Sequence, residues 1–256
     1  MTILIGIFIV IFGLVFGSFL NVCIYRIPLG ESFATGRSHC MACGHELRAP
    51  DLIPVFSYLF LHGKCRYCGA KISVQYPLIE LMNAFLYLAL YLRCGWHPIF
   101  FLYAAYGSAL IVTALIDIKT QIIPNGLVLF VGAVSVIGLF FLPEKPLGWR
   151  LLNGLLGLLA GGLPLYAAAL LSKGGMGLGD VKLAAACGLL LGWQNTLLAL
   201  FFAVVSAGIF AGFLVIMRKR KMQSAIAFGP FLSMGFGIAL LCGSTIITWY
   251  LHLLGI

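Results

Sequence analysis

Only seven acidic residues occur in this chain of 256, and three of them, Glu80, Asp117 and Asp180, lie in or at the edge of apolar segments. Ionisable side chains are costly in lipid, so they indicate function by default. Two carboxylates that share a site cannot both ionise cheaply, and one keeps its proton while the other is charged. Such a pair can activate a water molecule and protonate a leaving amine, which is the chemistry of an aspartic peptidase.

Each aspartate also has a simpler explanation. Asp180 could cap the helix that follows Gly177-Leu178-Gly179, and Asp117 could pair with Lys119. The order of the apolar segments, however, predicts that both carboxylates lie at the same face of a membrane. Their shared position favours a functional pair, and the glycines before Asp180 would let a substrate backbone approach closely.

A second cluster consists of cysteines in two C-x-x-C motifs, Cys40–Cys43 and Cys65–Cys68, each followed by glycine. Four thiolates at this spacing predict a closed tetrahedral zinc site that is structural rather than catalytic. Disulfides or a redox pair are the alternative, which the expected cytoplasmic location disfavours. We interpret the flanking His39 and His45 as surface residues. The other four cysteines fit the role of small packing residues: Cys23, Cys94, Cys187 and Cys242.

The composition shows what kind of scaffold holds these residues. Hydrophobic residues make up 62% of the chain and charged residues 9%, against about 25% charged in soluble domains. An all-α polytopic membrane protein follows, with about eight transmembrane helices, because several apolar runs approach the roughly 20 residues that a bilayer requires. The expected spans are 2–25, 76–93, 98–118, 125–142, 151–171, 180–193, 196–217 and 229–253.

The polar residues divide the chain into three parts. We predict a first transmembrane helix at 1–25, a cytoplasmic four-cysteine zinc-binding domain at 26–75, and a seven-helix membrane domain at 76–256 that carries the aspartates. Glycine pairs at helical spacing, Gly13/Gly17, Gly157/Gly161 and Gly208/Gly212, fit close helix packing. The first apolar run lacks a basic start and a cleavage site, so we expect it to be retained.

The basic residues predict the orientation. With the amino terminus outside and the four-cysteine domain inside, thirteen of the 16 Lys and Arg residues are cytoplasmic, including the run at 218–221. Only Arg93, Lys145 and Arg150 then lie outside, together with Glu144. This distribution agrees with the positive-inside tendency. The same distribution explains the net charge of +9, so this charge does not indicate that the protein binds nucleic acid.

In their order and joint presence, these motifs resemble those of the type IV prepilin leader peptidases, a family of GxGD-type intramembrane aspartic peptidases. The matching segments cover nearly the whole chain: Gly17-Ser18-Phe19-Leu20-Asn21-Val22, Tyr25-Arg26-Ile27-Pro28, both cysteine motifs, Ile53-Pro54, Tyr76-Pro77-Leu78-Ile79-Glu80, Asp117, Ile123-Pro124 and Met176-Gly177-Leu178-Gly179-Asp180-Val181-Lys182.

The resemblance implies a bifunctional enzyme of the bacterial cytoplasmic membrane. It would remove the short basic leader of prepilins or pseudopilins after a glycine, at the cytoplasmic face, and methylate the new terminal amine with S-adenosylmethionine. Asp117 and Asp180 would be catalytic, and the four cysteines would bind zinc. Family members often carry acidic residues where Lys119 and Asn125 stand here. No Gly-rich nucleotide-binding motif indicates the methyl transfer, which rests on the resemblance alone.

Four further residues are candidates for substrate binding: Glu80, Gly177, Gly179 and Lys182. Glu80 could attract the basic leader or the new amine, or it could simply order the start of its helix. Two other functional classes remain open. The membrane carboxylates could serve an ion- or proton-coupled transporter, although no inverted repeat is evident. A scaffold that docks a partner through the zinc domain would leave the paired aspartates unexplained.

Overall fold

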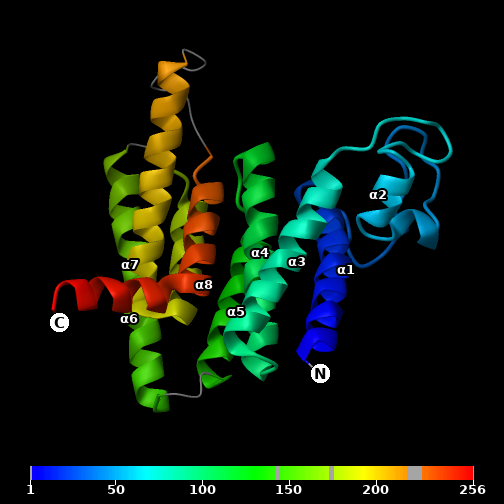
Figure 1. The fold of residues 1–256 in the computed structure, drawn as a ribbon. Coiled ribbons are helices and arrows are strands. Elements are labelled where there is room, and N and C mark those ends of the chain that lie inside the picture. Colours follow the sequence, from blue (N-terminus) through cyan, green and yellow to red (C-terminus); the bar gives the residue numbers. More distant parts are fainter. Residues whose placement is uncertain (1, 142–144, 173–175, 218–226, 256) are drawn as a thin grey trace. The chain divides into compact units, whose positions relative to one another are not determined.

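The computed structural model describes residues 2–141, 145–172, 176–217 and 227–255, and these residues form helices joined by loops. Glu144, Lys173 and the basic run at 218–221 lie outside the described residues. The chain divides into two compact units, Met1–Trp96 and His97–Ile256. Figure 1 shows the helices of each unit in sequence colours.

The first unit contains two long helices, α1 (Thr2–Leu29) and α3 (Gln75–Cys94), with a small polar domain between them in the sequence. The short η1 (Ala49–Leu52) and α2 (Phe56–Phe60) belong to that domain. α1 and α3 pack side by side (Figure 1) because Gly13 and Gly17 leave no side chain at the crossing. A Cβ atom at Gly17 would lie 2.6 Å from the Cα of Glu80. The small-residue contact predicted for this pair is therefore confirmed.

The second unit consists of α4 (Pro98–Thr120), α5 (Asn125–Phe141), α6 (Leu147–Leu171), α7 (Leu178–Ile216) and α8 (Gly229–Leu253). α7 is the centre of this unit and packs against α5, α6 and α8, while α4 packs against α8 and α5. Gly157 and Gly161 meet the backbone of Gly188 and Ala184 in α7, as the sequence predicts. Gly208 and Gly212 have nothing within 4 Å of a Cβ position, so the packing predicted for them was wrong.

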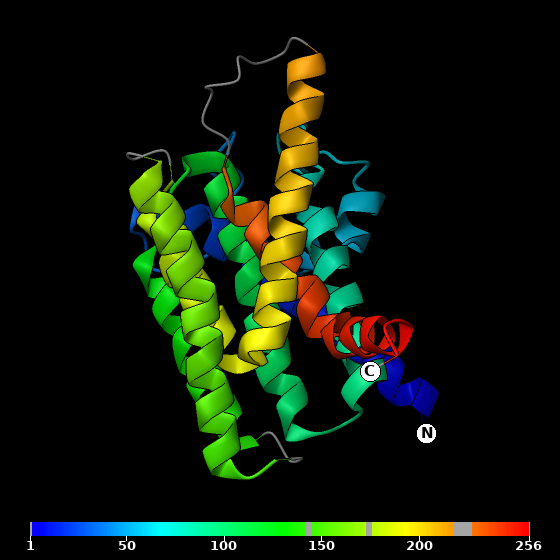
Figure 2. The same ribbon diagram turned by 90° about the vertical axis from the view of Figure 1, so that its left-hand side faces the viewer.

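The predicted number of about eight membrane spans was also wrong. Six of the described helices are long and apolar enough to cross a membrane, α5 has only 17 residues, and α2 belongs to the polar domain. The two spans expected at 180–193 and 196–217 both fall within the 39 residues of α7. At about 1.5 Å per residue, a straight helix of this length would far exceed a hydrocarbon core of about 30 Å. Gly192 interrupts α7 with non-helical angles (φ 77°, ψ 170°), and the yellow part of the chain in Figure 2 changes direction.

Candidate active site and metal site

Asp117 lies in the last turn of α4, and its side chain is buried with 5% of the residue exposed. The backbone N–H of Gly229, at the start of α8, donates a hydrogen bond of 2.9 Å to its Oδ2. Gly229 fits so closely that an added Cβ would lie 2.6 Å from this oxygen. The start of α8 therefore fixes the carboxylate from outside its own helix. No salt bridge joins Asp117 to Lys119 among the described residues.

Asp180 lies in the first turn of α7 and is 8% exposed. Gly177 occupies the N-cap position and offers no capping side chain, so capping does not explain why an aspartate stands at 180. The Oδ1 atom of Asp180 is buried and has no hydrogen-bond partner among the described residues. Its carboxylate lies close enough to Asp117 for the two charges to interact. Asp117 at the end of α4 and Asp180 at the start of α7 are thus both buried carboxylates at helix ends.

The segments that follow the two aspartates are linked near this site. Lys182 Nζ donates a hydrogen bond of 3.2 Å to Asn125 Oδ1 at the start of α5. Gly179 packs against Ile123, whose Cβ would lie 3.0 Å from a Cβ added at 179. Gly177 has more room, because only the Asp180 carboxylate and the Gly179 backbone lie within 4 Å of such an atom. Close packing therefore accounts for a glycine at 179.

The four predicted cysteine ligands come together in the polar domain of the first unit. The Sγ atoms of Cys40, Cys43, Cys65 and Cys68 all lie within 4.8 Å of one another, and those of Cys40 and Cys68 are 3.9 Å apart. A tetrahedral zinc ion with Zn–S bonds of about 2.3 Å requires sulfurs about 3.8 Å apart. The cluster therefore fits zinc. His39 and His45 are not members of it.

Both cysteine motifs adopt the same local turn. The N–H of Gly44 bonds to the Cys40 carbonyl at 2.8 Å, and the N–H of Gly69 bonds to the Cys65 carbonyl at 2.9 Å. The two glycines have φ values of 71° and 72°, in the left-handed region that side chains rarely adopt. The backbone N–H groups of Ala42 and Cys43 also lower the pKa of the Cys40 thiol to about 6. In the same cluster, desolvation and hydrogen bonds with the other three sulfurs raise the pKa of the Cys68 thiol to about 11, so the first negative charge of the cluster falls on Cys40.

Asp51 connects η1 to the second cysteine motif, a contact that the sequence analysis missed. Its carboxylate accepts hydrogen bonds from Arg66 Nε at 2.6 Å, from the Tyr67 hydroxyl at 3.0 Å and from the Arg48 N–H at 3.1 Å. Desolvation opposes ionisation of Asp51, but the hydrogen bonds from Arg66, Arg48 and Tyr67 outweigh it and lower the pKa of the carboxyl. The Tyr67 ring also packs against the His45 ring in a tilted arrangement, with ring centroids 3.7 Å apart. The two cysteine motifs are therefore held together by more than their sulfurs.

Glu80 joins the polar domain to α3. Its carboxylate accepts a hydrogen bond of 2.7 Å from the N–H of Val55, and the Ser18 hydroxyl of α1 bonds to it as well. Val55 has φ 61° and ψ −49°, and the Phe56 N–H bonds back to the Pro54 carbonyl at 2.6 Å. This is a classical γ-turn, which is rare and strained for a β-branched residue. Glu80 therefore orders the turn before α2, whereas the structural alternative considered for it was the start of its own helix.

Comparisons with known proteins cover both units. Residues 11–94 match the bacterial peptidase A24 N-terminal domain, and residues 104–212 match the type IV leader peptidase family. The chain is 35% identical over 243 residues to a prepilin leader peptidase/N-methyltransferase of Bacillus subtilis, covering 95% of this chain and 96% of that protein.

Relatives of the same name in Aeromonas salmonicida and Pseudomonas putida are 33% and 32% identical. These alignments cover 94% and 96% of this chain, and 92% and 93% of the respective relatives. No solved structure matches the chain. Since the similarity spans both units at this level of identity, the chain belongs to the prepilin leader peptidase/N-methyltransferase family.

Proposed function

We propose that this protein is a membrane aspartic endopeptidase that removes the short basic leader from type IV prepilins or pseudopilins. Cleavage would follow a glycine at the cytoplasmic face, and the enzyme would then N-methylate the new terminal residue with S-adenosylmethionine. The observation that supports the proposal is that Asp117 and Asp180 are both buried at helix ends, where the charge of one acts on the other. The names of the relatives support both activities.

In the proposed mechanism, the aspartate pair holds one proton. The charged carboxylate removes a proton from water, and the protonated one donates its proton to the scissile carbonyl. The pair then protonates the leaving amine. The Gly229 N–H would support this mechanism, because it donates a hydrogen bond to Oδ2 of Asp117 and limits the motion of that carboxylate. We assign the shared proton to the pair rather than to either residue.

Several other residues have supporting roles in the proposal. Zinc bound by the four cysteines would stabilise the polar domain, because four protein ligands leave no position for a reacting water. Gly177, Gly179 and Lys182 lie beside Asp180 and are proposed to contact the substrate near its cleavage site. Glu80 would act on the leader or the new amine in addition to ordering Val55. The enzyme would be a multi-pass protein of the bacterial inner membrane, with the amino terminus outside and the polar domain in the cytoplasm.

Substitution of each aspartate tests the proposal. Asp117→Asn and Asp180→Asn nearly preserve side-chain volume, so folding should survive, and zinc content serves as a check on it. Each should abolish cleavage of a prepilin by detergent-purified enzyme. The double variant should lose little more, because the two residues act as one unit. Robust cleavage by either folded single variant would refute the two-aspartate mechanism. An ion- or proton-coupled transporter, which the family membership does not favour, would then have to be reconsidered.

A further inference from the structure

The short helix α2 exposes three large apolar side chains on one face. Phe56, Leu59 and Phe60 follow one another at helical spacing, so they point to the same side, and they are 55%, 61% and 79% exposed. Ile53, just before the helix, is half exposed as well. These four residues form the α2 patch. An exposed apolar patch on a polar domain marks a site of contact with a protein or a membrane.

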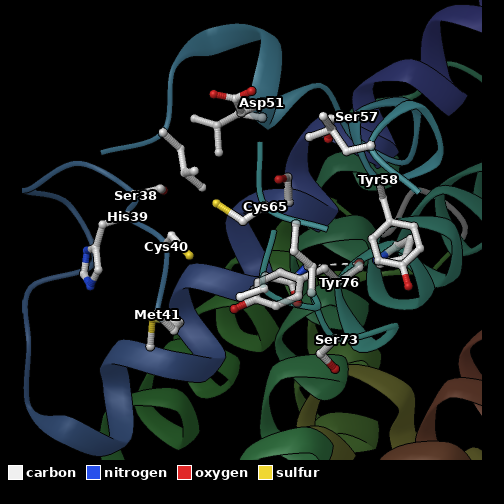
Figure 3. A pocket seen from close by; sticks show the side chains of 18 of the residues that line it. Ser38, His39, Cys40, Met41, Asp51, Ser57, Tyr58, Cys65, Ser73 and Tyr76 are labelled. Atoms are coloured by element: carbon white, nitrogen blue, oxygen red, sulfur yellow. Dashed lines mark hydrogen bonds between the residues drawn. The ribbon is translucent and has the colours of Figure 1, made fainter. Parts of the chain in front are cut away.

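The opposite face of α2 turns toward the inside of the polar domain. Ser57 and Tyr58 line a cavity of about 390 Å³ within the first unit, and Figure 3 shows both side chains around it. The polar side chains of α2 therefore face the domain, whereas the large apolar ones face outward. This is the reverse of a surface helix in a soluble protein, whose apolar face is turned toward the core.

The position of α2 along the membrane helices follows from Glu80. The N–H of Val55, at the start of α2, bonds to this carboxylate, and Glu80 packs against Gly17 of α1. Gly17 precedes Arg26, the first charged residue of α1, by nine residues, or about 14 Å of helix. The interfacial layer of a bilayer is only about 5–8 Å thick on each side. Figure 1 shows α2 beside the ends of α1 and α3 rather than beyond them. The beginning of α2 therefore lies at the level of the bilayer interface.

The part of α3 at this level also exposes apolar side chains. Leu78, Leu81 and Met82 lie within two residues of Glu80, and each is about half exposed. Because α3 is long and apolar enough to cross a membrane, lipid is the natural partner of these side chains. The α2 patch is thus at the same depth as a lipid-facing surface of the same unit.

Two lysines follow the patch in the sequence. Lys64 and Lys71 are opposite each other in an isolated antiparallel β-bridge, and both are exposed. Like charges directly opposite each other repel, and an anion bound between them would remove the repulsion. Neither lysine forms a salt bridge in the part of the chain that the structure describes. The phosphate of a lipid headgroup is such an anion, and it is present at the depth where the patch lies.

We propose that the α2 patch inserts into the interfacial layer of the membrane, and that Lys64 and Lys71 together bind the phosphate of an anionic phospholipid. Apolar side chains at the acyl boundary with lysines at the headgroups are the arrangement of an interfacial helix. The depth of the patch and the basic charge beside it favour lipid over a second protein as the occupant. This contact holds the polar domain against the bilayer where α1 and α3 leave it. The inference does not depend on the proposed peptidase or methyltransferase chemistry.

Fluorescence quenching by brominated lipid tests the depth of α2. Full-length Phe60→Trp is placed in nanodiscs of phosphatidylcholine and phosphatidylglycerol, with one protein per disc. The signal of the four native tryptophans is measured on the wild type and subtracted. Brominated chains should remove roughly half of the added fluorescence, because interfacial helices lie about 5–10 Å into the headgroup and acyl boundary.

Glu46→Trp is the control for this measurement. Glu46 pairs with Arg37 at the exposed surface of the same domain, so a tryptophan there should keep its fluorescence. Equal quenching of Phe60→Trp and Glu46→Trp, or none in either, would overturn the inference. Quenching of Phe60→Trp that is absent until prepilin is added, or until two copies share a disc, would assign the patch to a protein partner and overturn it as well.

A phosphatidylglycerol with a photoreactive headgroup tests the lysine pair. Irradiation of the wild type should label the peptide 61–72. Lys64→Gln should lower this label by about fivefold, the contribution of one lysine at an anionic surface. Arg37→Gln is the matched control, because Glu46 already neutralises that charge. Absence of label from 61–72, or equal label in the two variants, would overturn the headgroup site.

Zinc content and prepilin cleavage, measured on the same samples, show whether each variant is folded. They also separate the inference from the proposed function. A protein that cleaves prepilin but shows neither quenching nor label refutes the membrane contact alone, whereas quenching and label without cleavage refute the peptidase alone. If a variant loses its zinc, the position of the label on the wild type decides.

Discussion

The backbone N–H of Gly229 donates a 2.9 Å hydrogen bond to Oδ2 of Asp117, although 112 residues separate the two in the sequence. This contact makes the beginning of α8 part of the aspartate site. It also explains why residue 229 is a glycine, since a Cβ atom would lie 2.6 Å from the carboxylate oxygen and 3.0 Å from its carbon.

Gly229→Ala should therefore reduce peptidase activity more than it reduces stability. The added methyl group must displace the Asp117 carboxylate, and a displacement on the order of 1 Å can lower the rate by about 100-fold. The rate of prepilin cleavage by purified protein is the measurement. Gly237→Ala is the matched control on α8, because nothing lies within 4 Å of its Cβ position. Equal cleavage rates for the two variants would contradict the positioning role of Gly229.

Metal analysis tests the cysteine cluster. We expect one zinc ion per chain in the wild type and none in a Cys40→Ser/Cys65→Ser variant, because zinc requires its thiolate ligands. Loss of zinc should make the polar domain sensitive to protease, since a domain of this size depends on a bound metal for part of its stability. Cys242→Ser is the control, as its thiol lies outside the cluster. Zinc retained in the double variant would rule out the site.

Asp51→Asn should destabilise the polar domain by about 1–3 kcal/mol, because the buried carboxylate loses charge-assisted hydrogen bonds from Arg66, Tyr67 and the Arg48 N–H. Limited proteolysis with rising temperature would measure the change. Glu46→Gln is the matched control: Glu46 pairs with Arg37, but both side chains are largely exposed, and such pairs contribute about 0–1 kcal/mol. Equal effects of the two substitutions would show that Asp51 is not a structural anchor.

The pH dependence of this effect has a definite sign. The pKa of Asp51 is lowered in the folded protein, so its contribution is complete above the unfolded value of about 3.9 and is lost as the pH falls through the folded value. The difference between wild type and Asp51→Asn should therefore be the same at pH 8 and pH 6. A difference that disappears between these two values would assign the effect to another group.

Gly17→Ala tests the packing of α1 against α3. Alanine is favoured over glycine in a helix by about 0.5–1 kcal/mol, but here the methyl group meets the backbone of Glu80 and overpacking costs about 1–3 kcal/mol. We expect a lower melting temperature in detergent. Gly6→Ala, on the same helix with nothing within 4 Å, should not lower it. A melting temperature that rises in both variants would contradict the close contact.

Prediction of this fold from the sequence is most successful where local spacing determines structure. Two C-x-x-C-Gly motifs define their turns almost by themselves, and the four sulfurs converge as predicted. It is least successful where a contact depends on distant segments. No local pattern indicates that Gly229 meets Asp117 or that Glu80 meets Val55. The number of spans was overestimated because α5, expected to cross the membrane at 125–142, has only 17 residues, and because the spans expected at 180–193 and 196–217 both lie in α7, which is interrupted at Gly192 close to the boundary expected between them.

The bond between Glu80 and Val55 has a consequence for how this protein can be divided. The carboxylate on a membrane helix secures a strained turn in the polar domain, and the Ser18 hydroxyl of α1 supports the same carboxylate. Excised residues 26–75 would lack both side chains, and the Val55 turn would relax to an ordinary conformation. The domain would therefore lose this turn if it were moved to another protein, even though its four metal ligands all lie within residues 26–75. A soluble version for biochemical work would have to carry a replacement for the carboxylate at position 80.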